Sequence, residues 1–119
     1  MAKYMLLIYV PAPGGPSREE LEAQLPRWWD YTRQLADTGA LVADEALEAP
    51  DAARTLRVRG GARQITDGPC AATSEVLGGF YVIDVADWAA AEEWAAKIPS
   101  APYGSVEIRP VMEFADAPA

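Results

Sequence analysis

Apolar and polar positions along the chain predict four main strands and two helices. Short apolar runs rich in β-branched and aromatic residues cover 3–10, 40–47, 79–85 and 105–114, which is typical of strands. Between the first two runs, mostly apolar residues recur at the spacing of one helix face; they are Leu21, Leu25, Trp28, Thr32 and Leu35. A second stripe of this kind follows the third run and consists of Trp88, Ala91, Ala95 and Ile98. The expected order is therefore strand, helix, strand, strand, helix, strand.

Both predicted helices begin with capping signals. Ser17 and Glu20 form a Ser-x-x-Glu capping box before the first helix, and Asp87 can cap the second. Pro26 removes one backbone donor inside the first helix, which predicts a bend rather than a break. The residues expected on the more exposed faces of this helix are Asp30, Tyr31 and Arg33.

Two short alternating runs flank Gly60 and Gly61, a pair that accepts the positive φ angles of a tight hairpin turn. This pattern predicts a β-hairpin inserted at about 54–67. Without the insert, the remaining order is that of a split pair of βαβ units, which form an antiparallel sheet with both helices on one face. We therefore expect one α+β domain over 1–119 with a ferredoxin-like βαββαβ fold.

Helices on one side leave the other face of such a sheet uncovered. If Val106 and Ile108 face the helices, alternation places their neighbours on the uncovered side. The residues expected there are Glu107, Arg109, Val111 and either Phe80 with Val82 or Tyr81 with Ile83. An exposed apolar face of this size usually has a partner, so we expect a homodimer packed sheet against sheet.

Composition narrows the possible chemistry. With 10 basic and 18 acidic residues the net charge is −8, which disfavours binding to nucleic acid or to an anionic membrane. The apolar run at 4–10 is too short to span a bilayer and has no cleavage pattern after it, so a cytoplasmic protein is expected. One cysteine and no histidine exclude an internal disulfide, a Ser-His-Asp triad, a Cys-His pair and a conventional zinc site. We expect no metal or cofactor, and any proton transfer would depend on residues such as Asp and Glu.

Four segments, "KYMLLIY", "LADTGALVADEAL", "TDGPCAATSEVLGGFYVIDV" and "EEWAAKIPSAPYGSVEIRPVME", resemble the YCII-related family in the branch named for an Asp-Gly-Pro-Phe motif. The resemblance covers nearly the whole chain in the same order. It implies a dimeric α+β barrel. Related members include a dehydrochlorinase of a chlorinated aromatic compound, and others are encoded near, or fused to, extracytoplasmic-function sigma factors.

The chain departs from that family pattern at positions that carry chemistry. The phenylalanine of the motif is Cys70 here, and the continuation of the motif loses an acid and a lysine. The resemblance places a proton-transferring histidine at or near Trp28 and its aspartate partner at Ile98. Neither side chain moves a proton, so a lyase or dehalogenase that uses this pair is not expected.

Two carboxylates are the candidate catalytic residues. Asp67, followed by Gly68 and Pro69, is typical of a structural turn, or it acts as a general base if Trp28 or Tyr81 partly desolvates it. Glu45 lies in a segment that matches the family, and it is either a surface acid or the second acid–base group. After these residues, Gly78 and Gly79 are expected to mark a bulge or a close backbone approach at the start of a strand.

The candidate ligand-binding residues are Trp28, Trp29, Tyr81, Cys70 and Arg109. Trp28 and Trp29 lie about 100° apart on the helix, so one packs in the core and the other at a rim, or one forms an aromatic wall for a flat ligand. Cys70 has no assisting histidine and is expected to be a small apolar plug. Arg109 either pairs with Glu113 across the dimer or holds a ligand anion.

Three functions are consistent with these features. The first is a dimeric module that binds a small aromatic or apolar molecule without turnover. The second is a histidine-free lyase, isomerase or dehydrochlorinase-like enzyme in which Asp67 and Glu45, with Tyr81, act on an aromatic or enol-like substrate. The third, from the resemblance alone, is association with an extracytoplasmic-function sigma factor.

Overall fold

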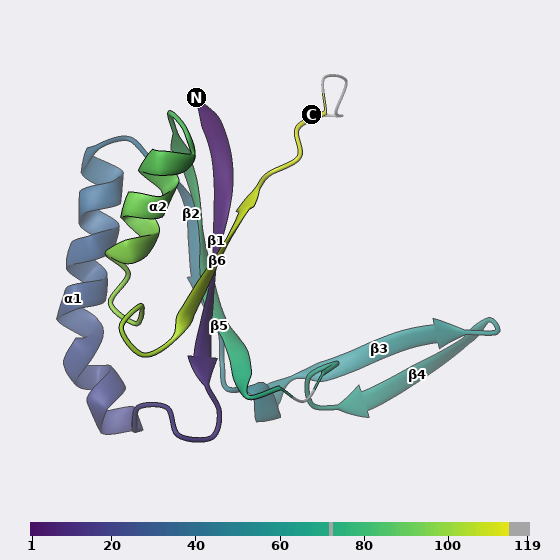
Figure 1. The fold of residues 1–119 in the computed structure, drawn as a ribbon. Coiled ribbons are helices and arrows are strands. Elements are labelled where there is room, and N and C mark those ends of the chain that lie inside the picture. The colour runs from purple at the N-terminus through teal and green to yellow at the C-terminus, as the bar shows by residue number, and fades with distance from the viewer. Residues whose placement is uncertain (72, 115–119) are drawn as a thin grey trace.

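The computed structural model describes residues 1–71 and 73–114. Within these residues nine elements follow one another (Figure 1). They are β1 (Ala2–Pro11), α1 (Arg18–Asp37), β2 (Leu41–Ala46), the short 3-10 helix η1 (Pro50–Ala52), β3 (Arg54–Arg59), β4 (Ala62–Asp67), β5 (Glu75–Val85), α2 (Trp88–Ala96) and β6 (Ser105–Pro110). The tail expected at 115–119 lies outside the described residues.

The main sheet is antiparallel, with four strands in the order β2-β5-β1-β6. Both helices cover the same face of this sheet, and no helix or strand of residues 1–71 and 73–114 covers the opposite face (Figure 1). This arrangement confirms the ferredoxin-like α+β fold. None of the helices in the described part of the chain has the length and apolar character needed to cross a membrane.

Strand β5 is longer than the apolar run that predicted it, because it starts at Glu75 instead of Gly79. Ile8 pairs with Gly79 and Tyr9 with Leu77, so Gly78 is the extra residue of a bulge. A Cβ atom on Gly79 would lie 2.8 Å from the carbonyl oxygen of Glu45. The two glycines are thus a bulge and a close backbone approach, as the sequence predicts.

The capping residues form the predicted hydrogen bonds. The backbone amide of Glu20 donates to the Ser17 hydroxyl oxygen at 3.1 Å, and the Ser17 amide donates to the Glu20 carboxylate at 3.2 Å. The amide of Ala90 donates to the Asp87 carboxylate at 2.9 Å. Helix α1 continues through Pro26 as one element.

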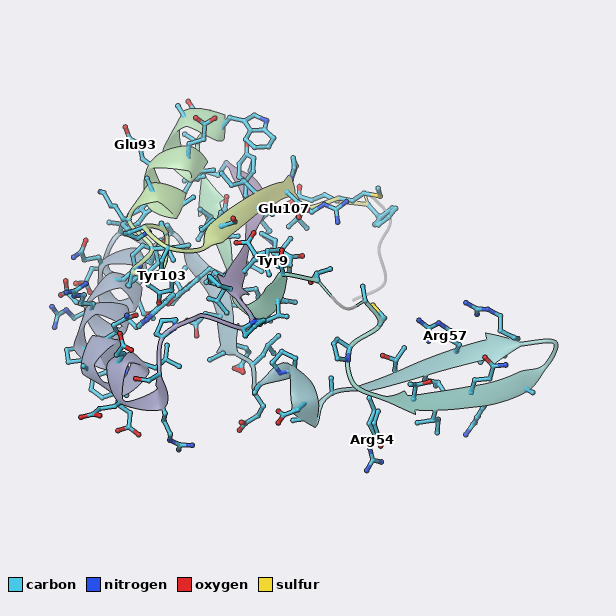
Figure 2. All side chains as sticks on the ribbon, turned by 60° about the horizontal axis from the view of Figure 1, so that its bottom comes forward. Tyr9, Arg54, Arg57, Glu93, Tyr103 and Glu107 are labelled. Carbon is cyan, nitrogen blue, oxygen red and sulfur yellow. The ribbon has the colours of Figure 1, made fainter. Side chains whose placement is uncertain are left out.

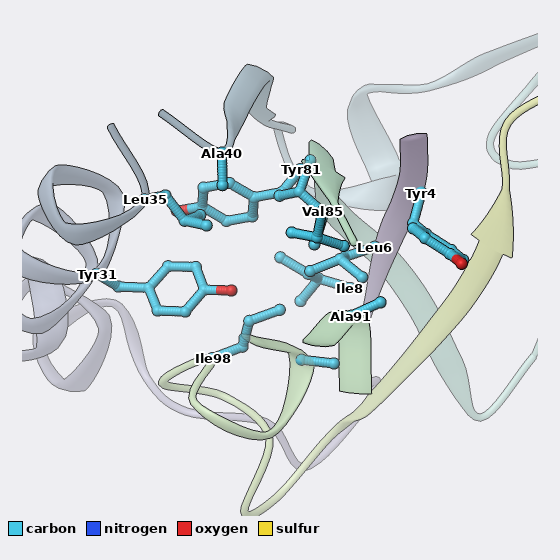
Figure 3. Packing of buried hydrophobic residues seen from close by; sticks show 12 residues of the cluster. Tyr4, Leu6, Ile8, Tyr31, Leu35, Ala40, Tyr81, Val85, Ala91 and Ile98 are labelled. Atoms are coloured by element: carbon cyan, nitrogen blue, oxygen red, sulfur yellow. The ribbon is translucent and has the colours of Figure 1, made fainter. Parts of the chain in front are cut away.

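The core lies between the sheet and the two helices, where Tyr31 and Leu35 of α1 extend toward Tyr81 and Ile98 (Figure 3). Tyr31 is only 5% exposed, so the prediction that it lies on an exposed face is wrong. Leu21 and Leu25, predicted to be buried, are 45% and 40% exposed. The buried face of α1 consists of Trp28, Tyr31 and Leu35, because the core contacts this helix only from Trp28 onward. Similarly, Trp88 of α2 is 47% exposed and packs edge-on against Tyr4.

Strands β3 and β4 form a separate two-stranded sheet, which is the predicted hairpin. Gly60 and Gly61 form its turn with φ angles of 57° and 79°. We call residues 54–67 the hairpin arm. The arm extends away from the main sheet on the side opposite to the helices (Figure 1).

Candidate functional site

The uncovered face of the main sheet carries four apolar side chains from its two central strands. Leu7 pairs with Phe80, and Met5 pairs with Val82. These four residues are half-buried, whereas Tyr81 and Ile83 on the same strand are buried toward the helices. The structure therefore decides between the two sets that the sequence left open. We call Met5, Leu7, Phe80 and Val82 the open-face cluster.

The two candidate catalytic carboxylates lie on different sheets. Asp67 ends β4 in the hairpin arm, its side chain is 93% exposed, and Arg54 lies 3.8 Å from it. Neither Trp28 nor Tyr81 desolvates it. Gly68 after it has the positive φ of a turn residue, at 100°. Glu45 lies on β2 opposite Phe80 with an exposed side chain.

Of the two adjacent acids on β2, the half-buried Asp44 lies on the helix-facing side. It pairs with Tyr81, whose side chain is in the core. The Tyr81 hydroxyl is 2.7 Å from the hydroxyl of Thr32. Burial raises the pKa of Tyr81, and the hydrogen bond with Thr32 partly offsets this rise. The nearby Asp44 carboxylate also raises the pKa. Tyr81 is therefore held as a neutral hydroxyl that joins α1 to β5.

The remaining predicted ligand-binding residues are scattered. Trp28 is half-buried against the core and Trp29 is 66% exposed, which is the arrangement with one tryptophan inside and one at the rim. Cys70 is exposed in the loop after β4, so the prediction of a buried apolar plug is wrong. Its carbonyl oxygen accepts a hydrogen bond from Arg57 at 3.3 Å, which ties this loop to the arm rather than to the core. Arg109 pairs with Glu107 on the same strand at 3.4 Å.

An open cavity of about 390 Å³ lies between α1 and the segment that connects α2 to β6. Its lining includes Ile98, where the family resemblance places the missing aspartate. The other lining residues are Arg27, Asp30, Tyr31 and Gln34 from α1, with Ala96, Lys97, Pro99 and Pro102 from the end of α2 and the following segment. We call this space the interhelix cavity.

Two cations in the lining of the interhelix cavity, Arg27 and Lys97, are available to a ligand. Asp30 accepts a hydrogen bond from Gln34 at 2.9 Å and pairs with Arg33 on its own helix, so its carboxylate already has partners. Arg27 forms no ion pair within the described residues. The ammonium group of Lys97 lies 5.0 Å from the centre of the Trp94 ring. The cavity thus has a local excess of positive charge in a chain of net charge −8.

Tyr31 contributes an apolar ring to the lining of the cavity. The Tyr31 hydroxyl donates a hydrogen bond to the carbonyl oxygen of Trp94 at 2.7 Å, and its ring packs edge-on against both Trp94 and Tyr81. Burial, and secondarily the neighbouring Tyr81, raise the pKa of Tyr31. Its hydroxyl is committed to this bond and leaves the ring as an apolar wall beside Pro99 and Pro102.

Sequence reasoning missed this cavity because its walls come from segments far apart in the chain. Arg27 and Lys97 have no motif around them, and only helix packing brings them together. One signal was present, since Tyr31 lies three residues after Trp28 and four before Leu35, which is the spacing of a helix face. Among the described residues, no three His, Cys, Asp or Glu side chains are grouped so that they could hold a metal ion.

Comparison with known proteins agrees with this fold. The family model of the YCII-related domain matches residues 2–115. An uncharacterised protein of Rhizobium meliloti (strain 1021) is 36% identical over 100 residues, which cover 82% of this chain and 81% of that protein. The match includes the main sheet, both helices and the hairpin arm. The chain therefore belongs to the YCII-related domain family.

Proposed function

We propose that this protein is a dimeric module that binds a small organic anion in the interhelix cavity without converting it. The observation that carries the proposal is the cavity itself, where Arg27 and Lys97 lie beside an apolar wall of Tyr31, Pro99 and Pro102. Small-molecule sites typically combine a mostly apolar lining with a few charged or polar groups that fix orientation. The ligand class that fits is a small carboxylate with a flat apolar or aromatic part.

Size and charge both support this class of ligand. A volume of about 390 Å³ lies near the lower end of the usual range for small-molecule sites. The carboxylate of Asp30 is already paired, so a ligand anion would not face an unpaired negative charge there. Arginine binds a carboxylate through two parallel N–H groups, while lysine acts as a point charge.

Binding without turnover is preferred because of where the acids lie. The acid–base alternative needs Asp67 and Glu45 to reach one substrate, whereas they lie on separate sheets with exposed side chains. Association with an extracytoplasmic-function sigma factor stays a prediction from the family resemblance.

The dimer in this proposal is supported by the open-face cluster. Met5, Leu7, Phe80 and Val82 form an apolar centre on a sheet face that no element of the described chain covers. Contiguous apolar surface of this kind usually marks an interface. A second copy that packs its own sheet on this face would remove the cluster from water.

The binding proposal is tested with salicylate and benzoate titrated into isotope-labelled protein and followed by NMR. We expect shift changes at residues 27–34 and 96–102, and unchanged probe signals after prolonged incubation. Arg27→Gln with Lys97→Gln should weaken binding about tenfold or more, because two charge-assisted contacts are lost.

The matched control is Arg18→Gln, which removes a cation that is 93% exposed at the start of α1 and distant in sequence from the cavity lining. It should leave binding unchanged. Equal binding of benzamide, or shift changes confined to other parts of the molecule, would contradict the proposed site.

A further inference from the structure

The hairpin arm exposes apolar side chains that no other part of the described chain covers. Leu56, Val58 and Ile65 are 58%, 57% and 66% exposed. The arm is an isolated two-stranded sheet, and such a hairpin is marginally stable unless it packs against another element. Its apolar side chains therefore indicate a contact surface.

These apolar residues all lie on one face of the arm. Leu56 is directly opposite Ile65, and Val58 is directly opposite Arg63, so the four side chains share that face. Arg57 belongs to the other face, and Figure 2 shows Arg54 and Arg57 pointing to opposite sides of the arm. The surface is thus an apolar strip with Arg63 near the tip and the pair of Arg54 and Asp67 at its base.

The charge of the arm is opposite to that of the rest of the chain. Residues 54–67 contain four arginines and one aspartate, which gives a net charge of +3. Since the whole chain has a charge of −8, the remainder has a charge of −11. A second copy of this chain therefore offers the arm a surface of complementary charge.

The direction and length of the arm place it beside whatever covers the open-face cluster. The arm leaves the main sheet on the uncovered side (Figure 1). Each of its strands has six residues, which corresponds to about 20 Å. Two sheets packed face to face lie about 10 Å apart, so an arm of this length extends past the sheet of a partner.

We propose that, in the dimer, the hairpin arm of each protomer lies along the body of the second copy. The strip of Leu56, Val58 and Ile65 contacts the partner, and Arg63, which lies on the same face near the tip, faces its carboxylates. This inference rests on the dimer in the proposed function and is independent of ligand binding in the interhelix cavity.

The first test measures the dimer dissociation constant by sedimentation of the full chain. Arg63→Glu should raise it at least about tenfold, because like charges across an interface are strongly unfavourable. Arg63→Lys should retain the wild-type value. The matched control Arg18→Glu changes the net charge equally on the first turn of α1 and should have little effect. Leu56→Ser should weaken the dimer without a change in charge.

The second test locates the arm directly. A photo-cross-linker is attached to Ala62→Cys at the arm tip in a Cys70→Ser background, and heavy-isotope and normal chains are mixed. We expect cross-links that join a heavy chain to a normal one. Backbone amide signals of the arm in each variant report whether the hairpin is still folded.

The outcomes separate this inference from the proposals on which it rests. A dimer that is insensitive to Arg63→Glu and Leu56→Ser, with no cross-link between chains, overturns the arm contact and leaves the sheet-to-sheet dimer. A monomer at tens of micromolar overturns both the arm contact and the sheet-to-sheet dimer. Neither result bears on salicylate binding.

Discussion

Two buried tyrosine hydroxyls connect the helices and the sheet at the scale of single residues. Tyr31 donates to the Trp94 carbonyl oxygen at the end of α2, and Tyr81 shares a hydrogen bond with Thr32 of α1. Burial raises the pKa of both tyrosines above the ordinary value of about 10. Since ionisation requires exposure to water, these two groups couple stability to alkaline pH.

We predict that stability is lost at alkaline pH through these tyrosines. Below about pH 10 the folded and the unfolded state both keep the phenol protons. Above about pH 10 the unfolded state releases them while the folded state retains them, so stability falls as pH rises. Each tyrosine contributes up to about 1.4 kcal/mol per pH unit until its folded-state pKa is reached. Urea unfolding from pH 8 to 11 measures the slope. Tyr31→Phe should make it shallower, and an unchanged slope would refute this coupling.

The glycine pair of β5 gives a second prediction at this scale. Gly79→Ala should destabilise the fold by about 1–3 kcal/mol, because its Cβ would lie 2.8 Å from the backbone oxygen of Glu45. Gly78→Ala is the matched control, since its Cβ would meet Val10 at an ordinary 3.6 Å. Thermal or urea unfolding compares the two variants. Equal effects would show that strand β2 moves aside.

At the scale of single elements, the stability of helix α1 depends on its capping box, because the first half of this helix has few core contacts. We predict that Ser17→Ala costs about 1 kcal/mol of unfolding free energy, whereas Ser17→Gly costs only a few tenths. Chemical denaturation measures both variants. Similar losses for Ala and Gly would mean that the hydrogen bond between the Ser17 side chain and the Glu20 amide does not determine the start of this helix.

At the scale of the whole molecule, the uncovered sheet face predicts the response to an added charge. Val82→Lys should shift the protein to a monomer that keeps its fold, because a buried unpaired ammonium group is unfavourable in an interface. Ala89→Lys adds the same charge to an exposed position of α2 and should leave the dimer intact. Light scattering gives the mass, and circular dichroism checks the fold. A Val82→Lys dimer would contradict the sheet-to-sheet arrangement.

Local chemistry made much of the fold predictable. The Ser17 and Asp87 caps, the Gly60–Gly61 turn and the bulge at Gly78 depend on residues that are close in the chain, and all four form as predicted. The candidate site was less predictable. A helix with apolar residues on more than one face, such as α1, does not itself determine which face is buried. Tyr31 was therefore placed on the surface.

By itself, the sequence determined the order of the elements, their capped ends, the hairpin arm and the absence of histidine chemistry, because these follow from neighbouring residues and composition. Only the tertiary structure decided that Tyr31 is buried, that Cys70 is exposed and that Arg27 and Lys97 share a cavity. Those outcomes depend on how α1, α2 and the sheet pack against one another. Such packing is a sum of many weak contacts between residues distant in the chain, and no local pattern encodes it.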